Sequence, residues 1–340
     1  MAIRLLDPRA VKPRLTADRE IAFIDVREHG QYGDGHPFFS VNMPYSRLEL
    51  LAETLLPRKD VPVILFDGDD GIASKAAKRL TDLGYTDLAF MAGGAPAWAK
   101  AGFELFKGVH VPSKAFGEAV EHVCDTPRIT ADDLKARLDN NDNFVLLDGR
   151  TPSEFRRMNI PGGHACPNGE LAYRISDMVP ADTTPIVINC AGRTRSIIGA
   201  QTLINFGVSN PVVALENGTQ GWQLAGYDLQ RGAVPGRLPE PSSQRIEDIR
   251  AAAESIRKTF NIAAIDLDTL RTWQTDATRS LYLLDVRTAE EYAAGHMSGA
   301  RHAPGGQLVQ ATDQWVAVRG ARIVLVDDSG IRATSAAMWL

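Results

Sequence analysis

The sequence predicts a repeated α/β fold in which each unit is a parallel sheet flanked by helices. A phrase made of an apolar run, Asp, any residue and Arg occurs three times, with its aspartates at Asp25, Asp148 and Asp285. A second apolar run follows each phrase, and segments with helical spacing of apolar residues lie between the runs. Such self-similarity along a chain indicates repeated structural units.

The spacing between the two runs supports three copies of one unit. The second runs "VPVILFD", "TPIVINC" and "ARIVLVD" end at Asp67, Cys190 and Asp327, each 42 positions after the aspartate of its phrase. The first two copies also match further on, where "GAPAWAKAGF" parallels "GTQGWQLAGY". Equal spacing of matched patterns therefore predicts equivalent strands.

The second unit shows how the elements follow one another. We expect strands at 144–148, 185–189 and 211–215, a helix over about 196–206 and another helix from 218. Parallel strands so close in sequence need right-handed helical crossovers. The loop after the second of these strands then lies at the carboxyl edge of the sheet, where ligands bind in such folds.

Changes in composition set the domain boundaries. The segment 107–127 contains one amphipathic helix, and "GAVPGRLPEPSSQ" at 232–244 predicts a linker before a polar helix at 245–259. The expected domains are residues 1–108, 109–235 and 236–340. Only 13 residues follow Asp327, so the third domain should lack its last strand and helix. Either the chain is a piece of a longer protein, which we favour, or another chain completes that sheet.

Composition excludes several classes of function. The chain has 340 residues, 44% of them hydrophobic, a net charge of −5 and scattered basic residues, so we expect no nucleic-acid partner. The N-terminus lacks a signal peptide pattern and no window is apolar enough to cross a membrane, which predicts a cytoplasmic protein without membrane contact. Three cysteines without CxxC spacing argue against a disulfide framework, and we expect no metal or cofactor.

Cys190 is the strongest candidate for chemistry. It joins the run "IVIN" to the loop "CAGRTRS", in which Gly192, Arg193 and Arg195 follow it. Backbone N–H groups of a tight turn, a helix N-terminus and two arginines all favour an anion, so we expect a thiolate nucleophile. The alternative, an inert buried cysteine, leaves the glycine and the arginines unexplained.

The motifs resemble those of the rhodanese family. The loop "CAGRTRS" fits the family's C-x-x-x-x-R-[ST], and "LLDGRTPSEFRRMNIPGG" resembles its DxRxxxEF…IPGA segment. The third unit's "LLDVRTAEEYAAGHMSGA" is closer still. The chain is thus similar to tandem rhodanese homology domains. Related phosphatases have a loop one residue longer, C-x5-R, so the loop size here favours sulfur over phosphorus.

The resemblance implies a thiosulfate sulfurtransferase acting through a persulfide on Cys190. Thiosulfate or a similar small anionic donor would supply sulfur, and cyanide or a thiol, possibly on a protein, would accept it. The alternative is a persulfide carrier or regulatory module without catalysis. The expected substrate-binding residues are Ala191, Gly192, Arg193, Thr194 and Arg195. The expected supporting residues are Asp148, Arg150 and Ser196, with Asp148 and Arg150 forming an ion pair.

The other two loops depart from this pattern. Asp67 and Asp327 stand where the second unit has Cys190, so neither loop can carry a persulfide. Packing, partner docking or shielding of the active loop are the roles left for these domains.

Four further residues carry weaker signals. Glu154 reads as a helix-start residue rather than a catalytic base, and Cys166 as packing rather than a resolving thiol. Trp222 fits the core or the pocket wall equally well, and Cys124 carries no functional signal.

Overall fold

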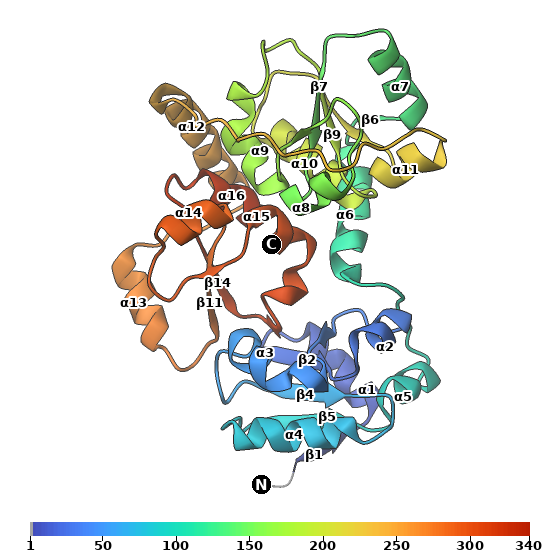
Figure 1. Cartoon of the computed structure of the whole chain (residues 1–340). Helices are drawn as coiled ribbons and strands as arrows, with labels where there is room; N and C mark the ends of the chain where they lie inside the picture. The colour runs from blue at the N-terminus through green and yellow to red at the C-terminus, as the bar shows by residue number, and fades with distance from the viewer. Residues whose placement is uncertain (1–2) are drawn as a thin grey trace. The chain divides into compact units, whose positions relative to one another are not determined.

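The computed structural model describes residues 3–340, which divide into two compact units. The first unit comprises residues 3–112, 265–283 and 311–324, and the second comprises 113–264, 284–310 and 325–340. The third sequence repeat contributes to both units, because the division falls within two of its strands. Figure 1 shows the helices and strands along the chain.

The first repeat forms a sheet with strand order β1-β5-β4-β2-β13, and β3 pairs with β2. Its strands are β1 (Arg4–Leu6), β2 (Ile21–Asp25), β3 (Val41–Asn42), β4 (Val63–Phe66) and β5 (Leu88–Met91). Its helices are α1 (Pro8–Val11), α2 (His29–Asp34), α3 (Leu48–Leu55), α4 (Ile72–Asp82) and α5 (Gly94–Lys100). The pairings among β1 to β5 are parallel, whereas β13 (Val318–Arg319), from the third repeat, pairs antiparallel with β2.

The second repeat forms an all-parallel sheet with order β6-β10-β9-β7-β8. Its strands are β6 (Arg128–Ile129), β7 (Val145–Asp148), β8 (His164–Ala165), β9 (Ile186–Asn189) and β10 (Val212–Leu215). Its helices are α7 (Ala131–Asp139), α8 (Pro152–Arg157), α9 (Asn168–Arg174), α10 (Thr194–Asn205) and α11 (Gly218–Leu224). The expected elements are confirmed, except that α10 begins at Thr194, two residues earlier than expected.

Successive side chains along the strands of this sheet belong to two different buried clusters, one on each face of the sheet. Leu147 and Ile188 belong to one buried cluster, whereas Leu146 and Val187 belong to another. Successive side chains of a strand point to opposite faces, so the two clusters are the two cores of one layered domain.

The third repeat forms a shorter sheet, β12-β11-β14. Its strands are β11 (Leu281–Asp285), β12 (Arg301–His302) and β14 (Arg322–Val326). Its helices are α13 (Leu267–Thr275), α14 (Ala289–Ala294), α15 (Gly305–Gln310) and α16 (Ile331–Ala337). The order of these three strands corresponds to the order β8-β7-β9 in the second repeat.

Two helices between the repeats complete the chain. They are α6 (Val111–Cys124) and α12 (Ser243–Thr259), which confirms both helices expected from the sequence.

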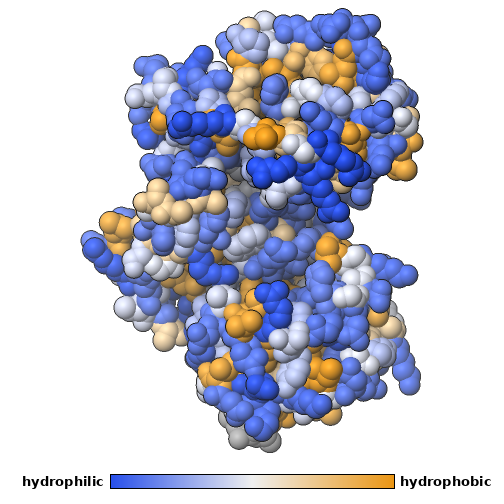
Figure 2. Space-filling model, viewed as in Figure 1, coloured by the Kyte–Doolittle hydropathy of each residue, from blue (hydrophilic) through white to orange (hydrophobic). Residues whose placement is uncertain are grey.

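The face shown in Figure 2 is mainly hydrophilic, with apolar residues in small separate groups. No helix within residues 3–340 is both long and apolar enough to cross a membrane.

Candidate active site

Cys190 lies at the carboxyl end of β9, in a short loop before α10. Cys190 is 1% exposed, so its sulfur lies inside the loop rather than on the surface. The start of α11 holds the loop through two backbone hydrogen bonds. The N–H of Thr219 donates to the Cys190 carbonyl at 2.8 Å, and the N–H of Gln220 donates to the Ala191 carbonyl at 3.0 Å.

Gly218 allows this close approach of α11. Its φ is +52°, and a Cβ there would collide with the carbonyl oxygens of Cys190 and Gly192. Only glycine fits such a left-handed, crowded position. The sequence pattern did not single out this residue, although its counterpart in the first repeat, Gly94, would collide in the same way with Asp67.

Ser196 fixes the loop from the side of α10. Its Oγ lies 3.6 Å from the Cys190 sulfur and within 2.8 Å of the Arg193 carbonyl and 3.1 Å of the Leu215 carbonyl. A single hydroxyl proton serves one of these carbonyls at a time, and the oxygen can accept from the thiol. Ser196 thus contacts the Cys190 sulfur directly.

Asp148 and Arg150 form the expected ion pair at the end of β7. Arg150 Nε donates to Asp148 Oδ1 at 2.8 Å and Nη2 to Oδ2 at 2.6 Å, and both side chains are 2% exposed. Arg150 Nη1 also lies 3.5 Å from Thr219 Oγ1. The pair therefore connects β7 to the residue that holds the Cys190 carbonyl.

Arg195 pairs with Glu154, a contact that the sequence did not suggest. Its guanidinium donates to both carboxylate oxygens, at 2.8 Å and 2.7 Å, and its side chain is only 9% exposed. Burial alone would raise the pKa of Glu154, but Arg195, with help from Thr151, lowers it to about 2. Glu154 is also part of the capping box of α8, so its expected helix-start role is confirmed.

Comparison of the three repeats contained a signal for this pair. Glu291 stands at the Glu154 position and occurs together with Arg332, whereas the first repeat has Gln31 together with Ile72. An acid at the first position thus occurs only together with an arginine at the second. Such joint occurrence indicates that the two residues contact each other.

Arg193 pairs with Glu121 of α6. The Arg193 side chain is 47% exposed, whereas that of Glu121 is 11% exposed and also contacts Arg128 at 3.1 Å. The sequence led us to expect that both loop arginines favour an anion. In the structure each of them has a carboxylate partner, which offsets part of its positive charge.

The Cys-less loops show what the backbone at this position binds. The Asp67 carboxylate accepts from the N–H groups of Asp69 at 2.9 Å and Ala73 at 2.8 Å. The Asp327 carboxylate accepts from those of Gly330 at 2.7 Å and Arg332 at 3.0 Å. We call the corresponding N–H groups of residues 192–196 the cradle. Both other loops thus hold a carboxylate with N–H groups of this stretch, although each loop uses a different pair of them.

The remaining candidates belong to the core or the surface. Cys166 is fully buried, and burial raises the pKa of its thiol well above the usual range, which makes it a poor resolving thiol. Trp222 is 2% exposed within the core under β9 and donates to the Asp228 carbonyl, so it belongs to the core rather than to a pocket wall. Cys124 is exposed on α6. Within residues 3–340 no group of three metal-ligating side chains occurs.

The fold and this loop define a class of protein. The rhodanese-like domain family matches residues 7–101, 130–225 and 266–340, and the chain belongs to that family. A crystal structure of a thiosulfate sulfurtransferase from Pseudomonas aeruginosa is 46% identical, with a TM-score of 0.97. The similarity covers 99% of this chain but 64% of that one, so our chain spans about two thirds of its length. YrkF of Bacillus subtilis, named as a sulfur carrier protein, is 26% identical over 134 residues, 37% of this chain and 71% of that protein.

Replacement of Glu154 by Gln is expected to destabilise the loop in a pH-dependent way. The variant leaves the buried Arg195 without a carboxylate, and we expect a loss of about 1 kcal/mol in the free energy of unfolding, since Glu154 is 35% exposed and partly screened. Because the folded pKa of Glu154 is lowered, its contribution is present above about pH 4.5 and is lost as the pH falls towards 2.

Urea unfolding at pH 7 and pH 3 measures this difference. The gap between wild type and variant should be smaller at pH 3. A gap that is equal at both pH values would show that the ion pair does not contribute to stability.

Proposed function

We propose that the chain is a sulfurtransferase in which Cys190 carries sulfur as a persulfide. The observation that carries the proposal is the cradle: two sister loops hold a carboxylate there, and the second repeat alone places a sulfur at the same position. A Cys–S–S⁻ group would put its negative terminal sulfur against the same N–H groups. Membership of the rhodanese-like family supports this reading.

The first half-reaction would take sulfur from thiosulfate. The Cys190 thiolate attacks the outer sulfur of thiosulfate, the S–S bond of the donor breaks, and sulfite leaves with the electron pair. The cradle and the start of α10 stabilise the negative charge of the persulfide. The likeness to a thiosulfate sulfurtransferase favours this donor.

The second half-reaction would regenerate the thiolate. The carbon of cyanide attacks the outer persulfide sulfur, the Cys190 S–S bond breaks, and thiocyanate leaves. A thiolate acceptor reacts in the same way and becomes a persulfide itself. Neither half-reaction needs an oxidant, a metal or a strong base.

A persulfide carrier remains the second candidate. The observation that favours it is the pairing of both loop arginines with carboxylates, which leaves little free positive charge to attract a small anion. A carrier would instead take its sulfur from a protein persulfide that docks on the loop.

Steady-state thiosulfate:cyanide sulfur transfer separates the two. Under the sulfurtransferase proposal, wild type turns over many times and its intact mass gains one sulfur atom after incubation with thiosulfate. Wild type that is no faster than Cys190→Ser, yet accepts sulfur from a protein persulfide, would leave only the carrier.

Glu121 is expected to weaken binding of an anionic donor. Replacing Glu121 by Gln frees the half-exposed Arg193, and we expect the KM for thiosulfate to fall by about 2- to 5-fold at low ionic strength, since nearby charges attract a small anion. The effect should fade at about 1 M salt, where the Debye length is about 3 Å.

Glu118→Gln is the matched control, since Glu118 is exposed on the same helix. Its KM should stay within experimental scatter of wild type. An unchanged KM in Glu121→Gln would remove Arg193 from the donor-binding residues.

A further inference from the structure

Helix α9 connects the active loop to the third repeat. At its first residue, Asn168 Nδ2 donates to the Arg195 carbonyl at 2.7 Å, and the Asn168 N–H donates to the Gly149 carbonyl at 3.0 Å. Asn168 is 7% exposed. The position of α9 therefore determines where the carbonyl of Arg195, and with it the cradle, is held.

The third repeat contacts the start of α9 through glycines. A Cβ on Gly306 would lie 2.9 Å from the Gly169 nitrogen and 3.0 Å from Asn168 Cβ, and one on Gly169 would lie 2.7 Å from the Gly306 nitrogen. We call this contact of Gly169, Gly305 and Gly306 the glycine seam. It brings the backbones of α9 and α15 together with no room for a side chain.

A largely buried ring of charges holds α9 two residues further on, at Glu170. Arg332 Nη1 lies 3.2 Å from both Glu170 carboxylate oxygens and 2.6 Å from Glu291. Arg174 closes the ring through Glu170 at 2.7 Å and Glu291 at 3.4 Å. Arg332 is fully buried, so this is a fixed contact rather than a mobile surface pair.

The repeat comparison shows that Arg332 makes a contact that Arg195 does not make. It occupies the loop position of Arg195 and has the corresponding acid partner, Glu291, but its own loop has no cysteine. In addition, it contacts Glu170 of the neighbouring repeat. In the first repeat the same position is Ile72, with no such contact to make.

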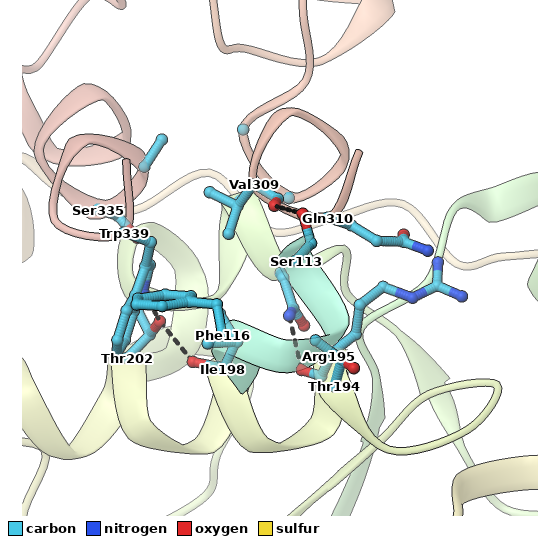
Figure 3. Close-up of a pocket in the computed structure, with 15 residues that line it drawn as sticks. Ser113, Phe116, Thr194, Arg195, Ile198, Thr202, Val309, Gln310, Ser335 and Trp339 are labelled. Atoms are coloured by element: carbon cyan, nitrogen blue, oxygen red, sulfur yellow. Dashed lines mark hydrogen bonds between the residues drawn. The ribbon is translucent and has the colours of Figure 1, made fainter. Parts of the chain in front are cut away.

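The rest of this contact region is well packed. Figure 3 shows Val309, Gln310, Ser335 and Trp339 of α15, α16 and the residues after it facing α10. Trp339 Nε1 donates to Thr202 Oγ1 at 2.9 Å. The cavity left between them is about 20 Å³, room for about one water molecule, so the third repeat can transmit a displacement to α9 and α10.

We propose that the third repeat positions the active loop, with Gly306 and Arg332 acting through α9 and Asn168 on the cradle around Cys190. They are positioning residues, and the inference rests on the sulfurtransferase function proposed above. A Cys-less copy would then be kept because the active repeat needs it for alignment.

Gly306→Ala tests the seam directly. Its methyl pushes on Gly169 and Asn168, and we expect kcat for thiosulfate:cyanide transfer to fall by about tenfold with KM within twofold of wild type, because small displacements of reacting groups lower rates steeply. Gly295→Ala is the matched control, since a Cβ there meets nothing within 4 Å, and it should behave as wild type.

Arg332→Met tests the charge ring, and Arg332→Lys is its rescue. The Met variant leaves Glu170 and Glu291 paired with Arg174, so the fold should survive while kcat falls. The Lys variant restores a cation and should recover part of kcat. Thermal melting identifies any variant that fails to fold. If the variants at one of the two positions, Gly306 or Arg332, fail to fold, the variants at the other position decide whether the positioning role holds.

A second readout, independent of turnover, is the rate at which iodoacetamide alkylates Cys190, measured from the mass of the peptide that contains it. We expect its pH profile to shift in Gly306→Ala and Arg332→Met but not in Gly295→Ala. Folded variants with wild-type kcat and wild-type alkylation profiles would overturn the positioning role. Absence of sulfur transfer in wild type would overturn the proposed function instead, while the alkylation profiles would still test the positioning.

Discussion

Cys190→Ser is expected to abolish sulfur transfer, with a loss of more than about 10³-fold in kcat, because a serine hydroxyl cannot form the persulfide. Intact mass after incubation with thiosulfate should show one added sulfur atom on wild type and none on the variant. The other two loops cannot replace Cys190, because Asp67 and Asp327 leave no nucleophilic sulfur at the same position.

The two other cysteines supply the controls. Cys124→Ser changes an exposed thiol on α6, and Cys166→Ala removes a fully buried one. Both should keep the added sulfur and most of kcat, although the second can lower stability through the small cavity it leaves. A persulfide found on Cys124 or Cys166 in wild type would contradict the assignment of Cys190.

Arg150→Met is expected to cause the largest loss of stability, about 3–5 kcal/mol in the free energy of unfolding. It leaves the Asp148 carboxylate buried beside the end of β7 without its guanidinium, where both side chains are 2% exposed. The loss should also loosen the Thr219 contact with the Cys190 carbonyl, because Arg150 lies against Thr219.

Urea unfolding measures this loss, and the double variant Asp148→Asn with Arg150→Met should recover much of it, since no unpaired charge is then buried. Lys78→Met is the control for a surface pair, because Lys78 and Asp82 are 78% and 60% exposed and contribute little. A single variant as stable as the double variant would show that the buried charge is not the cause.

Much of the fold could be predicted because its causes are local or repeated. The spacing of 42 between matched runs predicted three equivalent units, and the strand and helix patterns of the second unit placed β7, β9 and α10 within two residues. The ion pair of Asp148 with Arg150 joins residues two apart on one strand end, so its geometry follows from the strand. The domain boundaries at 108 and 235 remain proposals.

The charge at the active loop could not be predicted in this way. Arg195 meets Glu154 across 41 residues, and Arg193 meets Glu121 across 72. Which carboxylate reaches which arginine depends on how α6 and α8 pack. The repeat comparison carries a signal for the pair of Arg195 and Glu154, whereas no such signal exists for Arg193 and Glu121. Two carboxylates distant in sequence therefore offset part of the positive charge that the loop arginines were expected to supply.

The sequence by itself determined that one of three equivalent strand ends carries a sulfur, since residue type and spacing are enough to show it. Only the tertiary structure decided what surrounds that sulfur. Gly218, Asn168 and the glycine seam matter through close backbone approach, which becomes visible only when segments far apart in the chain are packed together. The third repeat has Asp327 where the second has Cys190, and its Arg332 pairs both with Glu291 of its own repeat and with Glu170 of the second repeat.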